Sequence, residues 1–199
     1  MKNYSISLPS YSIGDNVYDK ICEICLPFGK KAICIGGKTA ISNVKDLIIE
    51  ACCGSELEIL DFLWYGGDAT YENVKKLEEN ELVKKADIIF GIGGGKALDT
   101  AKALAFKTGK NIFTFPTIAS NCAGTTAVSI MYNDDGSFKE PFFFTAPPRH
   151  CFIYTPVIAK SPARFMWAGI GDTYAKYFEA EMSSRGEDLV HYHALGVTT

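Results

Sequence analysis

The sequence lacks any long hydrophobic segment. Hydrophobic residues make up 47% of its 199 residues, but no run approaches the roughly 20 apolar residues that a membrane-spanning helix needs. The N-terminal stretch MKNYSISLPSYSIGD has no apolar core of the kind found in signal peptides. The net charge is only −3, which does not indicate electrostatic binding of nucleic acid. We therefore expect a globular, cytoplasmic protein that binds neither membranes nor nucleic acid.

The sequence has an odd number of cysteines. There are seven, which argues against a disulfide framework and favours the reduced thiols of a cytosolic protein. Cys22 and Cys25 form a CxxC motif on one face of an expected helix. Packing in the core explains this pair, and metal or redox chemistry is the alternative. No second CxxC motif follows.

The sequence does contain a glycine-rich turn between a strand and a helix. Residues 88–90 form an apolar run typical of a buried strand, and residues 96–107 have apolar side chains at helical spacing. Three consecutive glycines between them let the backbone approach a ligand closely. The N-terminus of the new helix favours an anion such as phosphate, and Lys96 adds positive charge. A tight turn without a ligand is the alternative, because the spacing matches neither a P-loop nor a GxGxxG motif at the first strand.

The alternation of strands and helices predicts an α/β fold with a doubly wound, Rossmann-like parallel sheet. The expected strands are residues 4–8, 11–13, 31–36, 58–64, 88–90, 111–115, 127–132 and 151–154. The expected helices are 15–26, 42–53, 71–82 and 96–107, with Asp15 capping the first. The glycine turn then lies in the middle of the sheet. Ligands bind beyond the carboxyl ends of such strands, which places them near loops 36–39, 66–70, 91–96 and 116–126.

The C-terminal part of the chain changes in character. Residues 133–136 (NDDG) are a hairpin turn signal, and Ser161 followed by Pro162 predicts the start of a helix. Only helices are expected beyond that point, at residues 163–168 and 171–183. We predict two domains, a dinucleotide-binding α/β domain at residues 1–160 and the first, incomplete helices of an all-helical metal and substrate domain at residues 161–199.

Three segments in order resemble the iron-containing (group III) alcohol dehydrogenase superfamily, and within it the glycerol dehydrogenases. They are GIGGGKALDTAKALA, FPTIASNCAGTTAVSIMYNDDGSF and GIGDTYAKYFEA. The resemblance extends from Pro9 to about Arg185. It implies an oxidoreductase that uses NAD or NADP and a metal, Zn²⁺ or Fe²⁺, to interconvert a small alcohol or polyol and its carbonyl compound. It also implies a homo-oligomer.

The resemblance assigns a set of cofactor contacts. The positions that match the glycerol dehydrogenase pattern are Gly94, Gly95, Lys96, Thr117, Ser120, Thr126, Val128 and Tyr132. From the residues alone, the hydroxyls of Thr117 and Ser120 could equally cap a turn. Lys38 is expected in the loop after the first buried strand, where an acidic residue would favour NAD and a lysine could bind a 2′-phosphate. The choice between NAD and NADP is therefore open.

Two further positions concern the substrate and the metal. In the loop that begins Asn121-Cys122, Cys122 replaces an aspartate that binds the polyol in glycerol dehydrogenases. A thiol cannot accept two hydroxyl hydrogen bonds, which favours another small alcohol, an aldehyde or an oxo-acid over glycerol. A catalytic thiol is the alternative, although no histidine is near it in sequence. By resemblance to a GxxD motif, Asp172 is a metal ligand, and an acid at a helix N-terminus is the alternative.

The family takes its metal-binding histidines from later helices, and the chain is expected to stop before them. We therefore assign no ligand role to His150, His191 or His193. Besides the dehydrogenase, two functions are open: a free-standing or inactive dinucleotide-binding module, and a lyase similar to dehydroquinate synthase. The GGGKALDTAKA segment favours the dehydrogenase. We expect this stretch alone to bind dinucleotide with little turnover and to expose the apolar side chains of Trp167 and Phe178.

Overall fold

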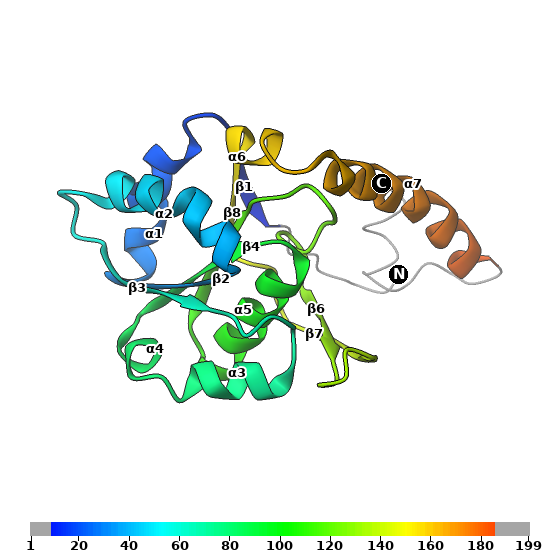
Figure 1. Ribbon diagram of the computed structural model, residues 1–199, viewed down its shortest axis with the longest axis horizontal. Coiled ribbons are helices and arrows are strands. Elements are labelled where there is room, and N and C mark those ends of the chain that lie inside the picture. The colour runs from blue at the N-terminus through cyan, green and yellow to red at the C-terminus, as the bar shows by residue number, and fades with distance from the viewer. Residues whose placement is uncertain (1–8, 186–199) are drawn as a thin grey trace, which may run out of the picture.

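The computed structural model describes residues 9–185, and a six-stranded sheet with all strands parallel lies at its centre (Figure 1). The strand order is β1-β8-β5-β4-β2-β3. The strands of this sheet are β1 (Ser10–Gly14), β2 (Lys31–Gly36), β3 (Glu58–Trp64), β4 (Ile88–Gly93), β5 (Asn111–Pro116) and β8 (His150–Tyr154). The predicted α/β class is confirmed, and β4, which precedes the glycine turn, is a central strand.

Helices cover both faces of the sheet, as a doubly wound fold requires. They are α1 (Ile21–Cys25), α2 (Lys38–Cys52), α3 (Tyr71–Glu78), α4 (Glu81–Lys85), α5 (Gly95–Thr108) and α6 (Thr155–Ala159), and α7 (Ala163–Ser184) follows outside these layers. Alternate strand residues face opposite layers because the side-chain period of a strand is two. Cys34 and Phe90 pack toward α1 and α2, while Ile33 and Ile89 pack toward α3, α4 and α5.

The strand order reverses between β2 and β4. From β2 the chain passes through α2 to β3 on one side, and from β4 it passes through α5 to β5 on the other. The backbones of β2 and β4 are close at this point, since a Cβ on Gly36 would lie 2.5 Å from the carbonyl oxygen of Ile92. Open α/β sheets bind ligands at such a reversal, beyond the carboxyl ends of the strands. The glycine turn is therefore at the expected ligand edge.

The N-terminal helix differs from the prediction. In place of one helix over residues 15–26, the chain forms a 3₁₀ turn η1 (Val17–Lys20), the short α1 and a second 3₁₀ turn η2 (Leu26–Phe28). The tight first turn buries Val17 and Tyr18 in the core. Asn16 holds the N-cap position of η1, and its side chain makes no capping hydrogen bond. The predicted role of Asp15 as a cap is therefore wrong. The predicted strand 4–8 lies outside the described residues.

Two other helix boundaries needed correction. α2 begins at Lys38 rather than near Ser42, because Gly37 adopts an extended conformation and takes the N-cap position. The predicted helix 71–82 is interrupted. The side-chain oxygen of Asn80 accepts hydrogen bonds from the backbone N–H of Leu82, at 2.8 Å, and of Val83, so that a new helix, α4, starts there. Asparagine favours such cap positions over helix interiors.

Beyond β5, the chain forms an antiparallel hairpin of β6 (Val128–Tyr132) and β7 (Phe138–Phe143). The predicted turn is confirmed, since the Gly136 N–H donates to the Asn133 carbonyl at 2.9 Å. The sequence did not predict β7 or α6. α7 runs without a break through Gly169 and Gly171, which corrects the two predicted pieces. Ser161 does not cap α7, because its hydroxyl donates to the carbonyl of Ile158 and Pro162 holds the cap position.

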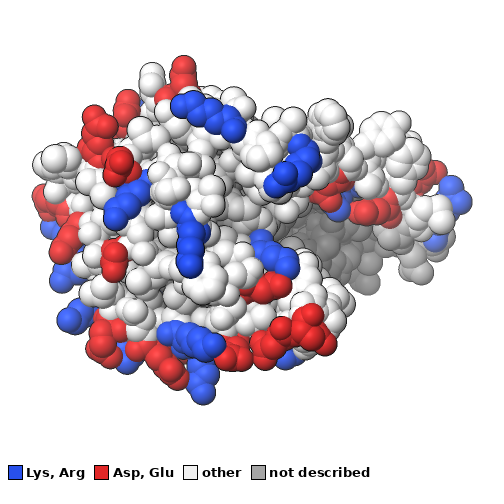
Figure 2. Space-filling model, viewed as in Figure 1, with Lys and Arg blue, Asp and Glu red and all other residues white. Residues whose placement is uncertain are grey.

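α7 extends away from the rest of the molecule (Figure 1). The expected apolar exposure is confirmed, because Trp167 is 73% and Phe178 is 51% exposed. On the face shown in Figure 2, acidic and basic side chains of the described residues are interspersed and do not form a broad basic surface. Within residues 9–185, the helices are too short or too polar to cross a membrane.

Candidate functional site

The glycine turn (Gly93–Gly95) opens the N-terminus of α5. Gly93 has a φ of +137°, which residues with a side chain rarely adopt. Gly94 holds the N-cap position, and no side chain caps the helix. A Cβ on Gly94 would lie 2.6 Å from Ile118 Cδ1, and one on Gly95 would lie 2.7 Å from Asn121 Nδ2. The first N–H groups of α5 thus lack a capping side chain, and the glycines make room for close approach to the backbone.

The N-terminus of α2 lies beside this turn. Gly37 caps α2 without a side-chain hydrogen bond, whereas side chains of Thr70 and Asn80 cap α3 and α4. The backbone nitrogen of Gly37 is 3.8 Å from the position that a Cβ on Gly93 would occupy. Two uncapped helix N-termini therefore meet at the strand-order reversal. Their dipoles and N–H groups favour anions, so the arrangement fits the pyrophosphate of a dinucleotide.

Two lysines flank the crevice between β2 and β4. Lys38 is the first residue of α2 rather than part of a loop, and its Nζ lies 4.6 Å from the ring centroid of Trp64. Lys96 Nζ is 2.6 Å from Asp68 Oδ2 and 4.6 Å from the ring centroid of Tyr132. The hydrogen bond to Asp68 raises the pKa of Lys96, so this ammonium stays charged at neutral pH. The structure thus brings Lys96 and Tyr132, two of the predicted cofactor contacts, together.

The loop between β5 and β6 (residues 117–127, called the β5–β6 loop) lies over the glycine turn. The Thr117 N–H donates to the Gly93 carbonyl at 3.2 Å, and Thr117 is buried. Ser120 is half-buried, whereas Asn121 and Cys122 are exposed. The side-chain oxygen of Asn121 accepts a hydrogen bond from the Ala123 N–H at 3.0 Å. The loop therefore holds the predicted substrate residues directly above the N-terminus of α5.

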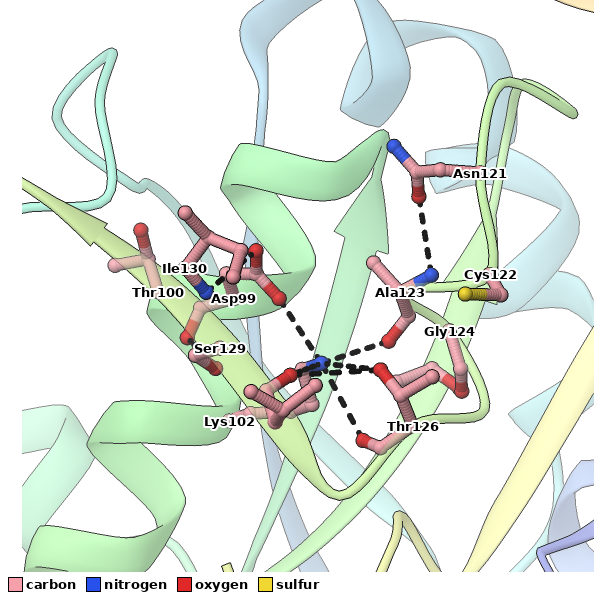
Figure 3. A network of polar contacts seen from close by, with 12 residues as sticks. Asp99, Thr100, Lys102, Asn121, Cys122, Ala123, Gly124, Thr126, Ser129 and Ile130 are labelled. Carbon is pink, nitrogen blue, oxygen red and sulfur yellow. Dashed lines mark hydrogen bonds and ion pairs between the residues drawn. The ribbon is translucent and has the colours of Figure 1, made fainter. Parts of the chain in front are cut away.

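Sequence reasoning missed the buried ion pair that supports this loop. Lys102 Nζ lies 2.9 Å from Asp99 Oδ1 within α5, and both side chains are buried (Figure 3). Burial raises the pKa of Asp99 and lowers that of Lys102, and the attraction between the two opposes both shifts. The only sequence signal for the pair is an acid and a base three residues apart in a helix otherwise rich in alanine.

The β5–β6 loop and α7 form the walls of an open cleft of about 1100 Å³, lined by Asn121, Cys122 and Asp172 among others. α7 passes so close to the loop that a Cβ on Gly169 would lie 2.0 Å from the carbonyl oxygen of Ala119. Asp172 is in the middle of α7, which excludes the alternative of an acid at a helix N-terminus. Its Oδ1 lies 3.5 Å from Lys176 Nζ.

The histidines do not join this cleft in the described part of the chain. The ring nitrogens of His150 lie 2.6 Å from Ser10 Oγ and 2.9 Å from Ser12 Oγ, where β8 pairs with β1. His191 and His193 lie outside the described residues. Among residues 9–185, no three or more histidine, cysteine or acidic side chains gather as a metal site would require. The described residues therefore contain no complete metal site, and the ligand role of Asp172 stays a prediction.

The CxxC motif lies in α1, which packs against α2. Cys25 is fully buried, and Cys22 Sγ donates to the carbonyl of Ala51 at 3.4 Å and to Ser55 Oγ at 3.2 Å. The pair is remote from the glycine turn, and all seven cysteines are free thiols.

Comparison with known proteins agrees with this geometry. The family model described as iron-containing alcohol dehydrogenase matches residues 9–151. The chain belongs to this family. It is 32% identical to a glycerol dehydrogenase of Escherichia coli O6:H1 over 175 residues, which are 88% of this chain and 47% of that protein. It is 30% identical to a glycolaldehyde reductase of Halobacterium salinarum, over 86% of this chain and 47% of that protein.

Solved structures of this family also share the fold. A probable glycerol dehydrogenase from Sinorhizobium meliloti 1021 matches with a TM-score of 0.80 and 28% identity, over 92% of this chain and 50% of that one. The chain thus spans about half the length of the relatives it matches. The predicted resemblance to glycerol dehydrogenases is confirmed.

Proposed function

We propose that this chain is the NAD(P)-binding part of a metal-dependent oxidoreductase that interconverts a small alcohol or polyol and its carbonyl compound. The observation that carries the proposal is the meeting of two uncapped helix N-termini at the glycine turn. A dinucleotide pyrophosphate is the anion that suits such a site in a doubly wound fold. When bound, the nicotinamide accepts or donates the hydride.

The side chains around the turn have distinct proposed roles. Gly94 and Gly95 present backbone N–H groups to the pyrophosphate, with Lys96 as the nearby positive charge. The other proposed cofactor contacts are Thr117, Ser120, Thr126, Val128 and Tyr132. Lys38 stands at the start of α2, where the adenosine ribose of a dinucleotide lies in related folds. Its ammonium suits a 2′-phosphate, so the proposal includes NADP as well as NAD.

For the substrate and the metal, the proposal rests on the cleft between the β5–β6 loop and α7. Asn121 and Cys122 are proposed to contact the alcohol or carbonyl group, and Asp172 is proposed as one ligand of Zn²⁺ or Fe²⁺. Lys176 beside Asp172 can keep the carboxylate paired without a metal. One carboxylate does not make a metal site by itself, because such sites take three or four protein ligands. The proposal further includes a cytoplasmic homo-oligomer and the domain division near Lys160.

Titration of the protein with NADH and with NADPH tests the proposal. Trp64 lies beside Lys38 at the crevice, so its fluorescence should be quenched on binding, and Trp64→Phe should remove most of the signal. Saturable quenching by at least one dinucleotide is expected. Absence of binding to both, measured by calorimetry as well, refutes the cofactor role.

A non-catalytic dinucleotide-binding module is the second candidate. One observation favours it: among the described residues, no three histidine, cysteine or acidic side chains lie together as a metal site would require. Hydride transfer to NAD(P) with small alcohols and added Zn²⁺ or Fe²⁺ separates the candidates. Binding without turnover favours the module, and metal-dependent turnover favours the dehydrogenase. A lyase similar to dehydroquinate synthase would instead act on a sugar-phosphate acid.

A further inference from the structure

Lys102 is a lysine of α5 whose side chain is only 2% exposed. Burial of an ammonium is costly unless its charge and its N–H groups find partners. The charge is matched by Asp99, whose Oδ1 lies 2.9 Å away. Asp99 is in turn attached to β6, because its Oδ2 accepts a hydrogen bond from the Ile130 N–H at 3.2 Å. The pair is thus fixed between α5 and β6.

The ammonium of Lys102 also faces backbone oxygens of the β5–β6 loop and of Val128, the first residue of β6 (Figure 3). An ammonium has three N–H groups. The ammonium forms an ion pair with Asp99, and its closest hydrogen-bond acceptors are the carbonyl oxygens of Ala123, at 2.8 Å, and of Val128. The carbonyl and hydroxyl oxygens of Thr126 lie farther away, at 3.4 and 3.3 Å. One ammonium therefore bridges both ends of the segment from Ala123 to Val128.

This segment carries residues of the proposed site. Thr126 and Val128 are proposed cofactor contacts, and Cys122 comes directly before it. The segment has a second anchor, since the Thr114 hydroxyl donates to the Gly124 carbonyl at 2.6 Å. Lys102 binds backbone oxygens, so it sets the path of the chain, and none of the contacts marked in Figure 3 involves the Cys122 side chain.

We propose that Lys102, held by Asp99, is a positioning residue that fixes the β5–β6 loop in the conformation that binds the dinucleotide. The inference rests on the proposed function. Because its side chain is only 2% exposed and its ammonium already binds Asp99 and two backbone carbonyls, Lys102 acts through the loop and does not itself contact the cofactor.

The test is the paired variant Asp99→Asn/Lys102→Met, which removes both charges and leaves neither buried alone. The Kd for the dinucleotide that the wild-type protein binds should rise about tenfold, the effect of losing a hydrogen bond to a charged group.

Cys151 provides a readout that needs no ligand. It is buried beneath the loop, where a Cβ on Gly124 would lie 3.3 Å from its Sγ. Iodoacetamide should alkylate Cys151 about tenfold faster in the paired variant, if loop opening exposes this thiol.

Peptide-level mass spectrometry separates loop opening from general unfolding, because the fully buried Cys34 of β2 should stay unmodified. Lys110→Met is the matched control. Lys110 also binds backbone carbonyls, those of Lys84 and Ala86, but it lies at the opposite end of β5. This variant should keep the wild-type Kd and the protection of Cys151.

An unchanged Kd together with a protected Cys151 in the paired variant overturns the proposal. If the wild-type protein binds neither dinucleotide, the proposed function fails, and Cys151 alkylation still tests the role of Lys102. If the paired variant does not fold, hydrogen exchange of the wild-type protein decides. Amides of residues 123–128 should exchange more slowly than those of the exposed hairpin turn at residues 134–136, and equal rates overturn the proposal.

Discussion

Gly169 offers a direct test of how α7 is placed. In the Gly169→Ala variant, the new Cβ would lie 2.0 Å from the carbonyl oxygen of Ala119, and ordinary contact begins at about 3.4 Å. Helix and loop must therefore separate by about 1.4 Å, or the carbonyl must rotate. Overpacking of this kind costs about 1–3 kcal/mol. It is offset by about 1 kcal/mol of gained helix propensity.

Gly171→Ala is the matched control, because a Cβ at this position of the same helix meets nothing within 4 Å. It gains the same helix propensity without the clash, so the difference between the variants isolates the contact with Ala119. We expect Gly169→Ala to unfold at a temperature several degrees below Gly171→Ala, as about 1 kcal/mol corresponds to about 2–4 °C for a chain of this size. Differential scanning calorimetry measures the difference. Equal midpoints for the two variants would show that α7 does not rest on the β5–β6 loop.

Three further predictions concern the cofactor crevice and the sheet edge. Gly95→Ala should raise the dinucleotide Kd about tenfold, because the added methyl group blocks the approach of the pyrophosphate to the backbone. The unfolding midpoint should change little, because the atom nearest to the new Cβ belongs to the flexible Asn121 side chain. An unchanged Kd in calorimetry would contradict the predicted contact with the pyrophosphate. Lys38→Ser should weaken NADPH binding more than NADH binding, and a constant ratio of the two Kd values would exclude contact with a 2′-phosphate. Burial lowers the pKa of His150, so the free energy of unfolding should be highest above the unfolded-state pKa of about 6.5 and fall as the pH drops below it. Urea titrations at several pH values measure this slope, which His150→Gln should flatten.

The sheet could be predicted because its strands are short apolar runs between turn signals. Residues 31–36 and 88–90 form strands as expected, and the glycine turn lies where the alternation of strands and helices places it. Strand β7 was missed because its sequence, FKEPFF, contains charged residues and a proline and is largely exposed. Helix α2 starts earlier than expected because an extended glycine, rather than Ser42, sets its first turn.

The support of the site was harder to predict than its position. The acceptors of Lys102 are backbone carbonyls that lie 21 to 26 residues further along the chain, and no residue type marks them. Likewise, nothing in the GIGD segment reveals that Gly169 is needed for contact with Ala119 rather than for a helix break. Sequence patterns report local conformation and burial, whereas these contacts depend on how separate elements meet.

These contacts explain how a loop without regular secondary structure can form a defined binding surface. Asn121 packs against Gly95, Lys102 binds the carbonyls of the loop, and Gly169 admits α7 against Ala119. Each contact uses the loop backbone or the space left by a glycine, and so the exposed side chain of Cys122 takes no part in holding the fold. A loop fixed in this way loses little conformational entropy when a ligand binds. It also separates the residues that hold the loop from those proposed to face the substrate, so a thiol at position 122, where the resemblance to glycerol dehydrogenases implies a carboxylate, does not disturb the fold.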